Sequence, residues 1–402
     1  MNGAARSPVK TYVFIDTETT GIFPEDPANL NNWNGPPIPG QRRDNALKLH
    51  ILVNHTDPNK APHVTEVALL AVPRELLEDA VARLEGDEDG VVPNAVNVHT
   101  RQIRPNLSED EWNSYRQKQV ANRALLLTPR DLQLKASFAE EWPGIRHFLT
   151  TIPKPACLIA HYGLGFDFRL LSAEFERNKI PKNERLPDGV FFVDSYLMAL
   201  DIESDYQKEL KQQMTAIDWS KVKAVENMDG DVQLEPDQTD DGATTEPADV
   251  DMNAYRQEPG SSYSTPPRAV RNESSSDLTT DNQRARRRLL DGAPTDSPTR
   301  CLSQATWSPA KKLRVNKDHH KLFRRNNSGG WSFDPLMAQA HFKTPKFKLQ
   351  TLYEELVGGT FNAHRAEDDC WALMKVCLTY GRDFVTYADC FYCQFPEKMN
   401  AN

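Results

Sequence analysis

The segment Thr11–Gly21, with the sequence TYVFIDTETTG, is the feature that most restricts how this chain folds. It is an apolar run that ends in two acidic residues, Asp16 and Glu18, separated by one residue. Residues two apart in a β-strand lie on the same face, so a strand here would present both carboxylates side by side. Buried carboxylates repel each other unless cations lie between them, and oxygen ligands favour Mg²⁺ or Mn²⁺ over zinc. For this motif alone, a solvated strand end with a turn at Gly21 is the alternative.

The composition predicts a folded domain together with an unfolded part. The chain has 402 residues, 39% hydrophobic content and 28 prolines, which favours disorder in part of it. The N-terminal MNGAARSPVK lacks an apolar core, and no apolar run has the length of a membrane span, so we expect a protein that is neither secreted nor membrane-spanning. The net charge is −9, but ten acidic residues and no Lys or Arg lie within Val225–Asp251, and without those ten the charge would be +1. The overall charge therefore does not exclude a polyanionic partner.

The six cysteines are scattered, which is typical of reduced thiols in the cytosol or nucleus. Cys390-x-x-Cys393 could form a zinc site with Cys370 and Cys377. Structural zinc sites usually contain two closely spaced pairs, so we prefer small core residues on C-terminal helices as the interpretation.

Periodicity predicts an α/β fold. Short connections between the early strands indicate an antiparallel meander, and a later strand–helix–strand unit indicates parallel pairing. The expected strands are Tyr12–Asp16, Leu47–Val53 within a long surface loop at Phe23–Asn59, His63–Pro73, Ala95–Ile103, Ala156–Ala160 and Val190–Val193. The expected helices are Arg74–Leu84, Leu107–Leu127, Phe138–Leu149 capped by Ser137, Leu170–Arg177, Leu349–Leu356, a helix capped by Asn362 that ends at Gly381, and a last helix within Phe384–Phe395.

The expected domain organisation is a disordered N-terminus (1–10), a domain in two parts (11–203 and 342–395), a disordered insertion between them (204–341) and a tail (396–402). The insertion carries RARRR and PAKKLRVNK, which are typical of nuclear-import or nucleic-acid-binding patches. Ser297-Pro298 and Ser308-Pro309 resemble proline-directed phosphorylation sites. An inert linker is the alternative.

Three further residues complete a pattern with the first acid pair. Asp167 follows a predicted strand, and His364 and Asp369 lie at the start of a predicted helix. Four carboxylates and one imidazole are what metal-assisted phosphodiester hydrolysis needs, because carboxylates hold two cations and a histidine can deprotonate water near neutral pH. Individually, Asp167 could be a helix cap, His364 could be a surface residue, and the adjacent Asp368 could be the ligand instead of Asp369.

These segments resemble the DEDDh 3′→5′ exonucleases and, within them, the three-prime repair exonuclease (TREX) family. FIDTETTGI resembles the first motif, LIAHYGLGFDFRLLSAEF the middle motif, and His364-x4-Asp369 the last motif, which selects Asp369 over Asp368. HVTEVALLAV, FFVDSYLMAL and LQTLYEEL also resemble family counterparts. The resemblance covers Thr11–Glu203 and Phe347–Tyr387.

The resemblance implies an RNase H-like fold, with a mixed five-stranded sheet flanked by helices. It implies two Mg²⁺ ions, replaceable by Mn²⁺, and release of 5′-mononucleotides from DNA 3′ ends, in single strands or frayed duplexes, during DNA repair or degradation. It also implies a homodimer joined through the edge strand Ala95–Ile103. The implied metal ligands are Asp16, Glu18, Asp167 and Asp369, with His364 as the base. The implied substrate contacts are Glu18, Thr19, Ile22, Phe166 and His161.

The chain departs from the family pattern within the middle motif, which bears on rate and affinity. Tyr162 follows His161 where the family usually has Asn, Phe166 replaces a common Tyr, and Leu164 and Gly165 stand where basic residues are expected. An exoribonuclease is the enzymatic alternative, since the same fold serves RNA trimming. A nucleic-acid-binding scaffold that acts through the insertion is the alternative from another class. The basic runs predict a location in the nucleus or cytoplasm.

Overall fold

The computed structural model describes residues 7–24, 45–86, 88, 90–121, 127–215, 304–317, 323–325, 331–334, 336 and 347–396. Several sequence-based predictions lie outside these residues. They concern residues 1–6 of the N-terminus, residues 25–44 of the expected surface loop, Val225–Asp251, the RARRR block, Ser297-Pro298 and residues 397–402 of the tail.

The core is a mixed sheet of six strands in the order β3-β2-β1-β4-β5-β8. Its first three strands form the predicted antiparallel meander, and β1, β4 and β5 are parallel to one another. This confirms the predicted α/β architecture of a mixed sheet with flanking helices. The strands are β1 (Thr11–Thr19), β2 (Val64–Pro73), β3 (Asn97–Gln102), β4 (Ala156–Ala160), β5 (Val190–Asp194) and β8 (Cys393–Gln394).

The sheet has one strand more than the five expected, because the last helix ends early. Helix α13 (Arg382–Phe391) stops before Tyr392, whose backbone is extended, and β8 then pairs antiparallel with β5. The Tyr392 ring packs 4.5 Å from the Phe191 ring of β5. Aromatic packing on the sheet edge therefore outweighs the helical pattern of this segment.

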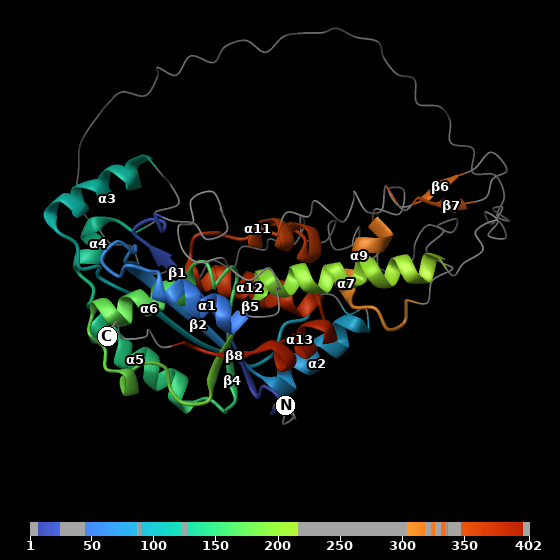
Figure 1. The fold of residues 1–402 in the computed structure, drawn as a ribbon, viewed down its shortest axis with the longest axis horizontal. Helices are drawn as coiled ribbons and strands as arrows, with labels where there is room; N and C mark the ends of the chain where they lie inside the picture. The colour runs from blue at the N-terminus through green and yellow to red at the C-terminus, as the bar shows by residue number, and fades with distance from the viewer. Residues whose placement is uncertain are drawn as a thin grey trace, which may run out of the picture.

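Helices cover both faces of the sheet, because successive strand residues point to opposite sides. Tyr12 and Phe14 of β1 face one hydrophobic core, and Val13 and Ile15 face the other. The first face is covered by α2 (Arg74–Glu85), α7 (Ser195–Thr215), α12 (Ala366–Thr379) and α13 (Figure 1). The second is covered by α1 (Asn45–Asn54), α5 (Phe138–Thr151) and α6 (Asp167–Arg177).

The prediction of a strand at Leu47–Val53 is wrong, because this segment lies within α1. Leu49, Leu52 and Val53 are buried against the second face of the sheet. The buried residues are spaced by three and four positions, as they are on one face of a helix.

The other helices follow the predictions with shifted ends. Ser137 begins α5 in a capping box, where its backbone N–H donates to Glu140 Oε2 at 2.7 Å. The single helix expected at Leu107–Leu127 is α3 (Glu109–Ala121), followed by the short α4 (Pro129–Gln133). Near the C-terminal motif, α11 (Leu349–Leu352) continues into the π-helical turn η5 (Tyr353–Val357). Among the helices of the described residues, none is long and apolar enough to cross a membrane.

Ordered elements cross the expected domain boundaries. Val9 is buried although it precedes residue 11, and α7 continues past residue 204 to Thr215. Helix α9 (Pro309–Lys317) lies inside the expected insertion, yet it runs beside α7 in Figure 1 and its Leu313 is buried in the first core. A two-stranded sheet of β6 (Phe323–Arg325) and β7 (Trp331–Phe333) also lies in this range.

Two cations of PAKKLRVNK, which forms α9, pair with acids of the folded domain. Arg314 pairs with Glu203 of α7, at 3.0 Å from Nε to Oε1, and with Glu355 of η5. Lys311 pairs with Glu209. Two of the four cations of this run are therefore paired within the protein, which leaves less of its charge for a nucleic acid than the sequence indicates.

Candidate active site

Strand β1 presents the first acid pair on the face that carries α12. Tyr12 and Phe14 are buried there, and Asp16 and Glu18 continue the same two-residue repeat toward the end of the strand. On the neighbouring β2, Asp16 lies opposite Ala68 and Glu18 lies opposite Glu66. The predicted side-by-side carboxylates follow from this geometry.

Helix α12 brings a third carboxylate to this pair. Asp16, Glu18 and Asp369 each offer one carboxylate oxygen, and these three oxygens lie within 4.8 Å of one another. Asp369 lies in the first turn of α12, and its Oδ2 accepts the backbone N–H of Arg365 at 3.1 Å. The adjacent Asp368 is not part of the cluster. The fold therefore selects between two neighbouring acids that the residue pattern alone left open.

Asp167 approaches the cluster from the other side of β1. It is the first residue of α6 and is buried, and its Oδ1 accepts the Oγ1 hydroxyl of Thr17 at 2.6 Å. Thr17 lies between Asp16 and Glu18 in the chain. Asp167 is not among the three mutually close carboxylates, but its charge acts on both Asp16 and Glu18.

The electrostatics of these acids favour a cation. Burial, reinforced by the neighbouring carboxylates, raises the pKa of Glu18 to about 8 and the pKa of Asp16 well above its usual range. Burial likewise raises the pKa of Asp167 to about 7 and that of Asp369 to about 6. Such groups ionise together only when positive charge compensates them. The all-oxygen donor set fits Mg²⁺ or Mn²⁺.

Glu66 is an acid of this site that sequence reasoning missed. Burial raises its pKa, and its carboxylate accepts the backbone N–H of Ala366, the first residue of α12. Its charge acts on both Glu18 and Asp369. The available signal was an acid inside the otherwise apolar strand HVTEVALLAV, where an unpaired charge is costly.

His364 lies on the loop between η5 and α12. Its side chain is exposed and its backbone φ is 71°, a left-handed conformation uncommon for residues other than glycine. Gly358 and Gly359 on the same loop also have positive φ. Arg365, and not the predicted Asn362, is the N-cap residue of α12. His364 therefore stands just outside the helix.

Three of the expected substrate-contact residues lie around this end of β1. Thr19 is buried, and its Oγ1 donates to the carbonyl of Gly21 at 2.5 Å. Ile22 is 85% exposed, and the half-buried Phe166 ring packs edge-on against Phe23 with centroids 5.7 Å apart. Their contacts with substrate stay predictions.

His161 has a different environment, because both of its ring nitrogens are engaged within the protein. Nε2 lies 2.7 Å from the carbonyl oxygen of Phe347, and Nδ1 lies 3.0 Å from Ser195 Oγ. Burial lowers the pKa of His161 to about 4. This side chain joins the two parts of the domain, and its contact with substrate stays a prediction.

The departures from the family pattern in the middle motif are structurally linked. Tyr162 has φ 63°, a conformation that Asn adopts more readily than an aromatic residue. A Cβ on Gly165 would lie 2.4 Å from the Tyr162 ring, and one on Gly163 would lie 2.5 Å from Ala160 Cβ. With Tyr162 in place, a basic residue at position 165 would collide with its ring.

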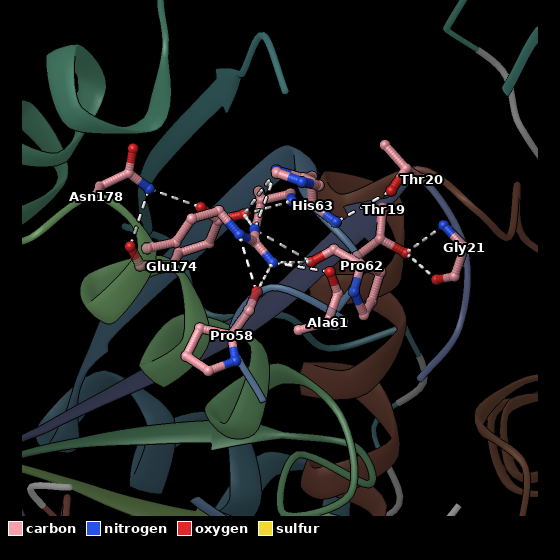
Figure 2. A network of polar contacts seen from close by, with 11 residues as sticks. Thr19, Thr20, Gly21, Pro58, Ala61, Pro62, His63, Glu174 and Asn178 are labelled. Carbon is pink, nitrogen blue, oxygen red and sulfur yellow. Dashed lines mark hydrogen bonds and ion pairs between the residues drawn. The ribbon is translucent and has the colours of Figure 1, made fainter. Parts of the chain in front are cut away.

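A buried polar network holds the turn that follows Glu18 (Figure 2). The backbone N–H of Thr20 donates to the carbonyl of His63, and the backbone N–H of His63 donates to Thr20 Oγ1. Arg177 then pairs with Glu174 at 2.6 Å and donates to the carbonyls of residues 58, 61 and 62. This network attaches the end of β1 to α6.

The described residues give no support to the zinc alternative. Cys370 and Cys377 are buried on α12, whereas Cys390 is exposed and Cys393 is half-buried. Within the described part of the chain, the three-acid cluster is the one group of His, Cys, Asp or Glu residues close enough to hold a metal.

No protein-family model matches the chain, and a search of curated proteins finds no match. Solved structures with similarity include exonuclease I from Methylocaldum szegediense, at 16% identity and a TM-score of 0.28, covering 48% of this chain and 29% of that one. They also include the zinc-bound E. coli exonuclease I–single-stranded DNA complex, at 14% identity and a TM-score of 0.27, covering 52% and 32%. The chain spans about a third of the length of these proteins. At such scores the likeness carries no weight for function.

Proposed function

We propose that this protein is a metal-dependent 3′→5′ DNA exonuclease of the DEDDh type, related to the TREX family, that releases 5′-mononucleotides. The observation that carries the proposal is the set of three half-buried carboxylates, each with an oxygen within 4.8 Å of the others, and the buried Asp167 held beside them by Thr17. Such a set has a high electrostatic cost without cations, and it matches the ligands of metal-assisted phosphodiester hydrolysis.

Each residue has a defined role in this proposal. Asp16, Glu18, Asp167 and Asp369 would hold two Mg²⁺ or Mn²⁺ ions. When bound, such ions stabilise the attacking and leaving oxygens of the phosphodiester. His364 accepts the proton of the attacking water through a ring nitrogen, for which its exposed, loop-borne side chain is suited. Exposed Ile22 would contact the terminal base.

Two further parts of the proposal rest on the resemblance. The homodimer would form through β3, which is an edge strand of the sheet with Val98 41% exposed. The substrate would be a single-stranded or frayed DNA 3′ end, and the role would be DNA repair or degradation.

Degradation of a 5′-labelled single-stranded DNA tests the proposal. With Mg²⁺ we expect a ladder that shortens from the 3′ end, and with EDTA we expect none. Asp369→Ala should abolish the ladder, whereas Asp368→Ala, the adjacent acid outside the cluster, should retain it. Full activity of Asp369→Ala, or equal loss in both variants, would contradict the proposed site.

The same assay on RNA of identical sequence separates the enzymatic alternatives, because the 2′-hydroxyl distinguishes the two sugars at a given site. Faster digestion of RNA would favour the exoribonuclease. If neither polymer is digested but nucleic acid is bound, the scaffold hypothesis would replace the nuclease.

A further inference from the structure

Helix α3 is attached to the domain by one side only. Trp112 and Tyr115 pack with Leu132 in a small cluster separate from the two cores of the sheet. The Tyr115 hydroxyl donates to the carbonyl of Leu127 at 2.9 Å, which fixes α3 to the segment before α4. Arg116 and Lys118 are exposed. The helix is thus an arm with one anchored side and one side toward solvent.

This arm reaches the end of β1 next to the acid cluster. The carboxylate of Glu18 acts electrostatically on Tyr115. Lys118 Nζ lies 3.6 Å from the position that a Cβ on Gly21 would take, and no atom from another residue outside 20–22 lies within 4 Å of that position. Gly21 is followed by Ile22, which is 85% exposed. The ammonium group therefore lies over an open turn, three residues after Glu18.

Lys118 differs from the neighbouring cations in having no assigned role in the fold. Arg177 is bound by Glu174 and backbone carbonyls, and Arg169 lies 4.1 Å from the centroid of the Phe23 ring. Within the ranges that the structure describes, the ammonium group of Lys118 takes part in no hydrogen bond or ion pair. A cation held over a turn at the rim of four acids can attract a polyanion that those acids alone would repel.

We infer that Lys118 binds a backbone phosphate of the DNA strand whose 3′ end occupies the acid cluster, so that α3 is a substrate-binding arm. The inference rests on the proposed nuclease function. Phosphate contacts orient a strand without reading its bases, so this contact would serve every sequence equally. It would lie upstream of the terminal nucleotide, because α3 stands at the rim and not among the metal ligands.

Binding of a 5′-fluorescent single-stranded oligonucleotide, measured by anisotropy in an Asp369→Ala background, tests the inference. Lys118→Gln should raise Kd by about threefold to tenfold and reduce the slope of log Kd against log salt by about 0.7, the value for one phosphate on a single strand. Arg116→Gln is the matched control. It removes the same charge from the same helix, two residues away and thus on another face, and should leave both quantities nearly unchanged.

Turnover and ligand length separate this contact from a general charge effect. In the otherwise wild-type enzyme, Lys118→Gln should raise KM with kcat nearly constant. Binding of a 5′-mononucleotide, which lacks an upstream phosphate, should be unaffected. The inference fails if Lys118→Gln and Arg116→Gln change Kd equally. It also fails if Lys118→Gln leaves Kd unchanged for an oligonucleotide that the parent protein binds. Either result leaves the proposed nuclease function intact. If the parent protein neither binds nor degrades DNA, the proposed function itself fails.

Discussion

The Oγ1 hydroxyl of Thr17 donates to Oδ1 of Asp167 at 2.6 Å, which joins the middle of the acidic β1 segment to the start of α6. The contact is buried, and the two residues are 150 positions apart. Thr17 alternates with Asp16 and Glu18 along the strand. One strand therefore contributes two acids on one face and the positioning donor for a third on the other.

Thr17→Val should lower the free energy of unfolding by about 1–3 kcal/mol, because a buried carboxyl group loses its donor. It should also raise the pKa of Asp167 further, since the hydroxyl lowers it in the intact protein. Thr17→Ser keeps the donor and is the control. Chemical denaturation of the two variants checks this, and equal stabilities would show that the hydroxyl is not a significant contact.

The metal-free protein should become less stable as the pH rises between about pH 5 and pH 8. The folded-state pKa values of Glu18, Asp167 and Asp369, at about 8, 7 and 6, lie above the usual carboxyl range of about 4. Protonation of these three carboxyl groups therefore stabilises the folded protein at low pH. This contribution is lost as the pH rises through their folded-state pKa values. Mg²⁺ should stabilise the protein most at high pH, where its ligands are ionised.

Thermal unfolding in EDTA and in Mg²⁺ across this pH range measures both effects. Asp369→Asn is the informative variant, because it removes one of the coupled charges. It should flatten the pH dependence in EDTA and weaken the Mg²⁺ stabilisation. A melting temperature in EDTA that rises steadily with pH, in parent and variant alike, would contradict this account of the acid cluster.

Arg177→Met should lower the free energy of unfolding by about 3–5 kcal/mol, because it leaves the carboxylate of Glu174 buried without its cationic partner. The side chains of Glu174 and Arg177 are 3% and 10% exposed. Arg83→Met breaks the exposed ion pair with Glu88 and should lower the free energy of unfolding by at most about 1 kcal/mol. Denaturant titration compares the two, and similar losses would mean that burial does not set the strength of this network.

Gly165→Ala should destabilise the protein by about 1–3 kcal/mol, because the new methyl group collides with the Tyr162 ring. In a Tyr162→Asn background the ring is absent, and Asn tolerates the left-handed backbone. Gly165→Ala should therefore lower the free energy of unfolding by less in that background. A double-mutant cycle measures the coupling. Additive effects would show that the two positions are independent.

Removal of residues 216–303, replaced by a flexible linker, should leave the melting temperature within a few degrees. It preserves α7, α9 and their pairs, including Arg314–Glu203 and the Tyr206–Ser308 hydroxyl contact at 2.5 Å. Removal of residues 204–341, the insertion expected from composition, deletes α9 and half of α7. That variant should unfold at a much lower temperature. Equal stability of both deletions would show that α9 is not an integral part of the domain.

Local patterns in the sequence were sufficient for the elements whose residues carry their own periodicity. The repeat of β1 placed Asp16 and Glu18 on one face, and the apolar run Ala156–Ala160 matched β4 to the residue. These predictions succeed because strand and helix periods are properties of neighbouring residues. The segment Leu47–Val53 failed because a short apolar run suits either period until a packing surface selects one.

Relationships between distant segments were decided by the tertiary structure. The position of α12 against the sheet selects Asp369 over Asp368, and the β1–β2 register brings Glu66 opposite Glu18. The packing of α3 carries Lys118 to Gly21. The polar composition around α9 indicated disorder, but acids of α7 and η5 pair with its Lys311 and Arg314 and hold it on the domain. The sequence by itself determined which groups the chain offers and on which face of each element they lie. Only the folded chain determined which of them meet, because contact energies between distant residues depend on distances that local patterns do not encode.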